Sequence, residues 1–237
     1  MRQTHANTQQ TIVDWFDAVY RRKGSGYLRP PEAYLVFLQL LRAGPQDTLL
    51  DVACGPGVLL QAACGYTRNL YGIDISAAAI EQGRARAVPA QMCVGNAERL
   101  PYADNTFDLI TCLGSLERML DVSKALTEIK RVAKPDARCC FLVRNSNTAT
   151  WKYLAALTAR QRSLGHAGAA TLRSWRTLFE SHGLAVIEVL PDQYPLQLRK
   201  KWSSLALRQV DFKQPIRVSG SIERANEFVF LLENSLE

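Results

Sequence analysis

The sequence predicts an α/β protein built on a doubly wound, mostly parallel sheet of seven strands. From Leu49 onward, short apolar runs alternate with longer segments of helical period, as in a parallel sheet flanked by helices. Each predicted helix follows its strand after only a few residues, as short βα loops require. A chain of 237 residues with no internal repeat suits one large domain of this kind.

The strands and helices follow from the same alternation. The apolar runs predict strands at 48–53, 70–75, 90–94, 107–113, 138–144, 184–190 and 227–233, the last two forming an antiparallel pair at the end of the sheet. The periodic segments predict helices at 58–64, 77–87, 123–132 and 172–182. Ser76 is an N-cap residue, Pro135 is expected to end the third helix, and Gly183 to end the fourth.

Three segments lie outside the alternation. We expect one domain, residues 1–237, with a helical cap at 1–44 and a ligand-binding core at 45–145. The segments 146–171 and 191–224 are expected to cover the substrate, because additions to an α/β sheet often cap the carboxyl ends of its strands, where ligands bind.

The composition favours a protein of the cytoplasm. No segment approaches the roughly 18 apolar residues that a membrane span needs, and the N-terminus has no signal-like apolar run. The six cysteines show no CxxC spacing and the three histidines no metal-ligand spacing, so we expect free thiols and no metal.

The net charge of +7 is concentrated in the second half. From Arg144 to Arg224 there are thirteen Lys and Arg against five Asp and Glu. Such an excess serves solubility or attracts an acidic substrate, an anionic lipid or nucleic acid.

The loop after the first predicted strand is the most informative part of the sequence. In Leu49-Leu50-Asp51-Val52-Ala53-Cys54-Gly55-Pro56-Gly57, an apolar strand runs into a Gly-Pro-Gly turn that opens a helix. Glycine lets the backbone approach a ligand where a β-carbon would obstruct it. A tight turn with a purely structural role gives the same pattern, so the glycine loop alone does not establish a ligand site.

Support for a ligand site comes from the ends of the next strands. Asp74 ends the second strand, where a carboxylate can accept both hydroxyls of a ribose. Asn96 follows the third strand, where a polar group can contact the amine of an adenine, and the small Ala97 leaves room for the ring. The fourth strand delivers 113–117 to the same edge. A helix cap and a polar loop are the alternatives for Asp74 and Asn96.

Taken in order, these segments resemble the class I S-adenosylmethionine-dependent methyltransferases, in particular the ubiquinone and menaquinone biosynthesis group with its type 11 methyltransferase domain. The resemblance is carried by LDVACGPG at 50–57, GIDIS at 72–76, GNAERLPYADNTFDLI at 95–110, LGSLER at 113–118 and ALTEIKRVAKPDA at 125–137. It implies a Rossmann-like methyltransferase fold, S-adenosyl-L-methionine as cofactor and S-adenosyl-L-homocysteine as product.

The resemblance also implies a set of cofactor-binding residues. They are Asp51, Ala53, Gly55 and Gly57 at the methionine moiety, Asp74 and Ile75 at the ribose, Asn96, Ala97 and Glu98 at the adenine, and Leu113 near the sulfonium. An N-terminal lid formed by Trp15, Phe16, Tyr20, Tyr27 and Arg29 is expected by position. Within it, Tyr27 and Arg29 are expected to contact the cofactor, Arg29 at the methionyl carboxylate, which brings the predicted cofactor-binding residues to twelve. An amphipathic helix packed on the sheet is the other interpretation of Trp15 and Phe16.

Two positions depart from the relatives. Asn96 stands where many of them carry Asp, which keeps an acceptor but can change the hydrogen bond to the adenine. Arg118 stands where LGSLEH-type relatives have His, so that loop offers no histidine for proton removal.

Methyl transfer is an in-line displacement, and a base is needed only when the nucleophile must lose a proton. Candidate bases are Glu117, His166 and Tyr194. The expected acceptor is a small molecule, acidic or lipid-like, such as a quinone precursor.

Three other functions are compatible with parts of this sequence. A nicotinamide-dependent dehydrogenase fits poorly, because Ala53 and Leu60 occupy outer glycine positions of G-x-G-x-x-G. A nucleic-acid (RNA) methyltransferase is an alternative suggested by the basic second half, although 113–116 is not an Asn/Asp-Pro-Pro-aromatic loop. A catalytically silent cofactor-binding protein would carry the same motifs and stays open.

Overall fold

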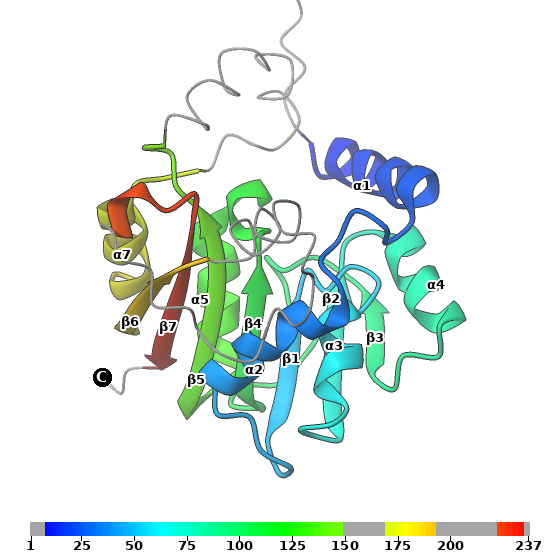
Figure 1. The fold of residues 1–237 in the computed structure, drawn as a ribbon, viewed down its shortest axis with the longest axis horizontal. Coiled ribbons are helices and arrows are strands. Elements are labelled where there is room, and N and C mark those ends of the chain that lie inside the picture. The colour runs from blue at the N-terminus through cyan, green and yellow to red at the C-terminus, as the bar shows by residue number, and fades with distance from the viewer. Residues whose placement is uncertain (1–7, 149–168, 193–221, 235–237) are drawn as a thin grey trace, which may run out of the picture.

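A seven-stranded sheet forms the centre of the structure, a computed structural model that describes residues 8–148, 169–192 and 222–234 (Figure 1). The strands are β1 (Thr48–Val52), β2 (Asn69–Asp74), β3 (Gln91–Val94), β4 (Phe107–Leu113), β5 (Ala133–Arg144), β6 (Leu184–Pro191) and β7 (Glu227–Asn234). The α-helices are α1 (Gln9–Lys23), α2 (Leu35–Leu40), α3 (Val58–Ala63), α4 (Ala77–Ala85), α5 (Val122–Val132) and α7 (Leu172–Glu180). Short 3₁₀ helices are η1 (Pro31–Tyr34), η2 (Leu116–Arg118) and η4 (Ile222–Arg224).

The strand order β3-β2-β1-β4-β5-β7-β6 confirms the predicted fold class. Strands β1 to β5 pair in parallel, and β7 runs antiparallel to both β5 and β6. The chain winds outward from β1 to β3, then crosses back to β4 beside β1. Ligands of such sheets bind at this switch point, at the carboxyl ends of the strands.

Helices cover both faces of the sheet. Helices α5 and α7 pack on one face through Ile129 and Trp175, both buried. The opposite face packs against α2 and α3 through residues such as Phe37 and Leu60. Because both faces are covered, β1 and β4 are buried along most of their length, which explains their continuous apolar runs.

The observed boundaries differ most from the prediction at β5. This strand begins at Ala133, directly after α5, and not at 138. Ala133 pairs with Phe107 while Arg138 pairs with Leu109, so the residues between them form an irregularity in the ladder. Pro135 lies within that irregularity and is not the residue that ends the helix, which stops at Val132. A proline is tolerated there because a bulged residue needs no ladder hydrogen bond.

Helix α1 lies above the carboxyl ends of β1 to β3 and beside α4 (Figure 1). The Asp17 carboxylate accepts hydrogen bonds from the Ser76 hydroxyl (2.5 Å) and from the Ala78 backbone N–H (3.2 Å). The Gln82 side-chain amide donates to the Tyr20 carbonyl at 2.7 Å. These bonds fix the predicted N-terminal cap at the start of α4, over the ligand edge.

None of the helices in the described ranges is long and apolar enough to cross a bilayer. All six cysteines are free thiols, and four of them are buried. Most of the expected capping insertions, with His166 and Tyr194, lie outside the described residues.

We predict that Gly72→Ala destabilises the protein. A β-carbon at Gly72 would lie 2.6 Å from Leu60 Cδ1 and 2.8 Å from Cys54 Sγ. Overpacking of a buried site costs about 1–3 kcal/mol, so urea denaturation should show a lower free energy of unfolding. Gly65→Ala is the matched control, because nothing lies within 4 Å of its β-carbon position. Equal stability of the two variants would contradict this account of Gly72.

Candidate functional site

The loop between β1 and α3 has a left-handed backbone at three positions. The φ angles are 58° at Ala53, 55° at Gly55 and 73° at Gly57. For Ala53 this conformation costs about 1 kcal/mol, a strain typical of functional loops. A β-carbon on Gly55 would lie 2.6 Å from the Tyr20 hydroxyl, so only glycine fits between the loop and α1.

Asp74, at the end of β2, is bonded to this loop. Its Oδ2 accepts a hydrogen bond from the Gly55 backbone N–H at 2.7 Å, and its Oδ1 accepts one from the Ser76 N–H at 2.9 Å. The α4 cap itself is the Ser76 hydroxyl, which accepts from the Ala79 N–H. Burial raises the pKa of Asp74 to about 6.

Asp51, on β1, is a second buried carboxylate near the loop. Only 4% of the residue is exposed, and its Oδ1 accepts a hydrogen bond from the Thr111 hydroxyl on β4 at 2.7 Å. Burial raises the pKa of Asp51 to about 7, and the nearby Asp74 adds to the shift. A positive group beside Asp51 would therefore be strongly favoured over water.

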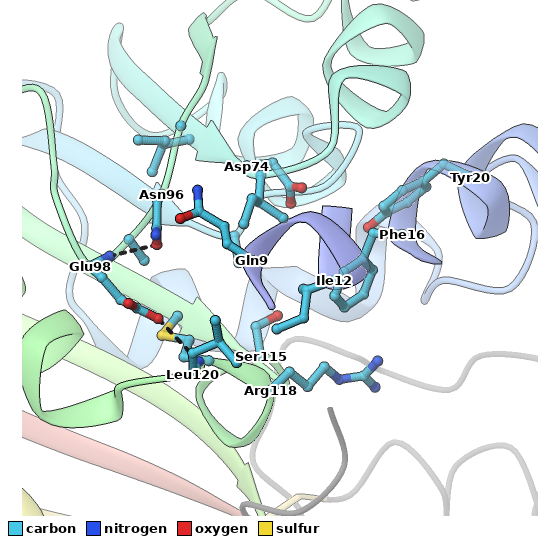
Figure 2. A pocket seen from close by; sticks show the side chains of 16 residues that line it. Gln9, Ile12, Phe16, Tyr20, Asp74, Asn96, Glu98, Ser115, Arg118 and Leu120 are labelled. Atoms are coloured by element: carbon cyan, nitrogen blue, oxygen red, sulfur yellow. Dashed lines mark hydrogen bonds between the residues drawn. The ribbon is translucent and has the colours of Figure 1, made fainter. Parts of the chain in front are cut away.

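A cavity here called the Asn96 cavity lies beneath α1 and has about 640 Å³ of free space, which includes space open to solvent (Figure 2). It extends from the ends of β2 and β3 to η2. Its lining residues are Gln9, Ile12, Phe16, Tyr20, Ala53, Ile73, Asp74, Ile75, Gly95, Asn96, Ala97, Glu98, Ser115, Arg118, Met119 and Leu120.

A second cavity, here called the Asp51 cavity, adjoins the first and has about 580 Å³ of free space, which includes space open to solvent. It is lined by Phe16, Tyr20, Tyr27, Leu28, Tyr34, Asp51, Ala53, Cys54, Gly55, Val58, Leu59, Leu113, Gly114, Ser115 and Arg118. Five of these residues also line the Asn96 cavity: Phe16, Tyr20, Ala53, Ser115 and Arg118. The two cavities therefore meet between the glycine loop and the end of β4.

Ten of the twelve residues predicted to bind a cofactor line these two cavities: Tyr27, Asp51, Ala53, Gly55, Asp74, Ile75, Asn96, Ala97, Glu98 and Leu113. Gly57 instead precedes α3, and a β-carbon there would crowd Met92. The convergence of segments from four strand ends on one space is what the motif order predicted.

The loop after β3 is held by its own polar groups. Asn96 Oδ1 accepts a hydrogen bond from the Glu98 backbone N–H at 2.9 Å (Figure 2). Glu98 Oε1 in turn accepts from the Leu120 and Asp121 N–H groups at 3.1 and 3.0 Å. The Glu98 carboxylate thus ties this loop to the segment after η2, a structural role that the motif did not reveal.

Arg29 has a different environment from the one expected. Its guanidinium donates two hydrogen bonds of 2.8 Å to Asp192 and one of 3.2 Å to Glu227, at the ends of β6 and β7. The structure therefore places it in a part-buried ion-pair cluster that anchors the N-terminal segment, and it is not among the residues that line the two cavities. Its partners are more than 160 residues away in sequence, so local reasoning could not find them.

Glu117, the one candidate base within the described residues, is fully enclosed. Only 2% of it is exposed, and its Oε1 lies 3.3 Å from Arg144 Nε. Burial raises the pKa of Glu117, while Arg118 and Arg144 oppose the shift. It is not among the residues that line either cavity, so the geometry does not favour it as a base.

The sequence predicts only part of the apolar face of α1. Ile12, Phe16 and Tyr20 recur every four residues and cover the Asn96 cavity, and the latter two reach the Asp51 cavity as well. The i, i+4, i+8 spacing of these residues predicts an apolar helix face, but it does not predict that this face lines a cavity.

Comparison with known proteins identifies the core. Residues 50–141 match a protein family described as "Methyltransferase domain". This match confirms the resemblance of the core to class I S-adenosylmethionine-dependent methyltransferases. The match runs from β1 into β5 and contains every cavity-lining loop that follows β1 to β4.

Relatives in sequence include quinone methyltransferases. A 2-phytyl-1,4-naphtoquinone methyltransferase of Trichormus variabilis is 36% identical over 109 residues, 42% of this chain and 48% of that protein. A ubiquinone/menaquinone biosynthesis C-methyltransferase of Burkholderia mallei is 31% identical over 146 residues, 58% of each chain. The chain thus matches about half the length of these relatives.

Solved structures share the fold at low identity. The [4+2]-cyclase SpnF aligns with a TM-score of 0.72 and 16% identity over 98% of each chain. The geranyl diphosphate C-methyltransferase of Streptomyces coelicolor, solved with S-adenosyl-L-homocysteine, aligns with a TM-score of 0.66 and 15% identity over 98% of this chain and 100% of the other. These likenesses confirm the Rossmann-like methyltransferase fold.

We predict a pH-dependent stability that Asp51→Asn removes in part. The pKa of Asp51 is about 7 in the folded protein against an ordinary 3.8. The folded state therefore keeps a proton that the unfolded chain releases, and it loses stability as the pH rises from about 4 to 7. Relative to wild type, Asp51→Asn should gain about 2 kcal/mol between pH 5 and pH 8, measured by urea denaturation without ligand. Parallel pH curves for the two proteins would refute this.

Proposed function

We propose that this chain transfers the methyl group of S-adenosyl-L-methionine to a small-molecule acceptor by in-line displacement. One observation carries the proposal: two cavities meet at Ala53 and Ser115, and each contains a buried carboxylate, Asp74 in one and Asp51 in the other. This arrangement suits a ligand with a nucleoside at one end and an amino acid at the other.

The Asn96 cavity is the proposed nucleoside site. A carboxylate has about four lone-pair positions, and Asp74 uses two of them on the N–H groups of Gly55 and Ser76. The remaining positions can accept the ribose hydroxyls. Asn96 and Ala97 border the space beside them, where the adenine ring would lie between polar and apolar walls.

The Asp51 cavity is the proposed methionine and acceptor site. Asp51 Oδ1 is bonded to Thr111, and the other oxygen can accept from the cofactor ammonium. The cofactor, when bound, supplies a methyl group already activated on a sulfonium. Leu113 and Ser115, beside the junction of the cavities, would border that methyl group.

The protein contributes to the reaction by positioning the nucleophile against the methyl group and by excluding water from the site. A methyl transfer requires the nucleophile about 3 to 3.5 Å from the methyl carbon, in line with the bond that breaks. Phe16 and Tyr20 line both cavities where they meet, and they would help to exclude water once a ligand is bound. The lone pair of the nucleophile forms the new bond to carbon, and the electrons of the broken bond remain on sulfur.

The acceptor is proposed to be a lipid-like or acidic ring compound and not a nucleic acid. The relatives in sequence are named for quinone substrates. Leu28, Val58 and Leu113 give the Asp51 cavity an apolar wall that suits such a ring.

The second candidate is a cofactor-binding protein that does not transfer the methyl group. It is favoured by one specific observation: the structural neighbour SpnF, with a TM-score of 0.72, is described as a [4+2]-cyclase. The same fold therefore serves other chemistry in that protein.

We predict that Asp74→Asn weakens S-adenosyl-L-homocysteine binding by more than about tenfold, because hydrogen bonds to a charged acceptor contribute about 1.5–3 kcal/mol. Isothermal titration calorimetry measures the affinity, and circular dichroism verifies the fold. The matched control is Asp136→Asn, which makes the same change at an exposed position of β5. Unchanged affinity in Asp74→Asn would remove Asp74 from the ribose role.

Turnover distinguishes the two candidate functions. The protein is incubated with S-adenosyl-L-methionine and a panel of reduced naphthoquinones, benzoquinones and phenolic acids, and S-adenosyl-L-homocysteine is measured by mass spectrometry. Acceptor-dependent product is expected for the methyltransferase. Tight cofactor binding with no product from any acceptor would favour the silent protein.

A further inference from the structure

Arg118 occupies the point where the two cavities meet. It is the last residue of η2, which follows β4 at the carboxyl edge of the sheet, and it lines both cavities. Figure 2 shows its side chain extending away from Asn96 and Glu98, with the guanidinium beyond Ile12 and on the side of Phe16. The Arg118 Cζ atom lies 5.7 Å from the centre of the Phe16 ring.

Neighbouring arginines at this edge form ion pairs with carboxylates, whereas Arg118 forms none with the residues that the structure describes. Arg29 donates to Asp192 and Glu227, and Arg144 contacts Glu117 at 3.3 Å. Among the described residues, the buried Nε of Arg118 has no hydrogen-bond partner, and no ion pair of Arg118 is present.

The groups that surround Arg118 do not neutralise it fully. Glu117 attracts it from the same turn, and Arg144 repels it. Tyr20 and Tyr27, which line the Asp51 cavity with it, interact with it electrostatically, and burial lowers the pKa of the guanidinium. Burying a charge without a partner is costly, so such a side chain in a binding cavity points to an anionic ligand group.

The cofactor has no net negative charge with which to neutralise Arg118. S-adenosyl-L-methionine carries a sulfonium and an ammonium against one carboxylate, so it adds positive charge. In the strand order, β4 lies on the side of β1 opposite to β2, which bears Asp74. Arg118 follows β4 and is therefore on the side of the cavity left for the acceptor.

We propose that Arg118 binds an oxyanion of the methyl acceptor, a phenolate, an enolate or a carboxylate, beside the junction of the two cavities. This inference rests on the proposed function and specifies its substrate class. A cation next to an acidic hydroxyl favours its ionised form. The acceptor proton then leaves to solvent before the transfer. The oxyanion, or the ring carbon conjugated with it, gives the electron pair that bonds to the methyl carbon. A carbon acceptor then loses its ring proton to water.

The proposal explains how the site can operate although Glu117 lies outside the two cavities. With the acceptor bound as an anion, an oxygen nucleophile needs no base in the cavity. The negative charge of the acceptor and the positive charge of the sulfonium cancel during transfer, which a site closed to water favours. Arg118 is thus a specificity-determining residue that contacts substrate.

The test measures the preference of the site for an anion. Wild-type protein saturated with S-adenosyl-L-homocysteine is titrated with 4-nitrophenol between about pH 5 and pH 9, because its two ionisation states differ in absorbance. The pair 2-naphthoate and 2-naphthamide is compared by calorimetry. We expect the anion of at least one probe to bind more than about tenfold more tightly than its neutral counterpart. A preference for nitrophenolate alone indicates a phenolate or enolate acceptor, and one for naphthoate alone indicates a carboxylate.

Three variants assign the preference to Arg118. Arg118→Met should abolish it and leave the affinity for S-adenosyl-L-homocysteine within about twofold, whereas Arg118→Lys should retain part of it. Arg21→Met is the matched control, because it removes the same charge from α1 at a side chain that is 71% exposed. It should behave as wild type.

The outcomes separate this inference from the proposed function. If wild type fails to bind S-adenosyl-L-homocysteine, the proposed function itself is wrong. If wild type binds it, the inference is overturned by any of three results: no binding of either anion, a preference that survives in Arg118→Met, or a large loss of S-adenosyl-L-homocysteine affinity in that variant, which would assign Arg118 to the cofactor.

Discussion

The contact between the Asp74 carboxylate and the backbone of the glycine loop is the interaction on which the site depends. It joins the end of β2 to the turn after β1 through the Gly55 N–H, and to the start of α4 through the Ser76 N–H. Burial raises the pKa of Asp74. The hydrogen bonds from these N–H groups oppose that rise, because they stabilise the negative charge of the carboxylate. The same bonds leave lone pairs on the carboxylate for a ligand.

A network of ion pairs stabilises the part of this sheet edge formed by β5, β6 and β7. Arg29 bridges Asp192 and Glu227, and Arg144 lies 3.4 Å from Glu227 and 3.3 Å from Glu117. These residues come from the N-terminal segment, η2 and the ends of β5, β6 and β7. The cluster thus connects the cap to the far half of the sheet, and each buried charge within it has a partner, as burial requires.

Between these two sets of interactions lies the space for ligands. On one side the carboxylates Asp51 and Asp74 favour positive and hydroxyl groups, and on the other Arg118 favours a negative one. Helix α1 closes the space above, held by Asp17 at the start of α4. In the proposed function, this separation of acidic and basic groups across the two adjoining cavities would orient the ligands, with the nucleoside near Asp74 and the acceptor near Arg118.

The sequence by itself determined the sheet, the glycine loop and the strand-end residues Asp74 and Asn96. These features depend on local physics: a strand buried on both faces must be apolar, and a left-handed turn that meets another backbone needs glycine. Only the tertiary structure decided the partners of charged side chains. It paired Arg29 with carboxylates more than 160 residues away and left Arg118 facing the cavity. Such choices depend on which distant groups share a low-dielectric space, and no local pattern records that.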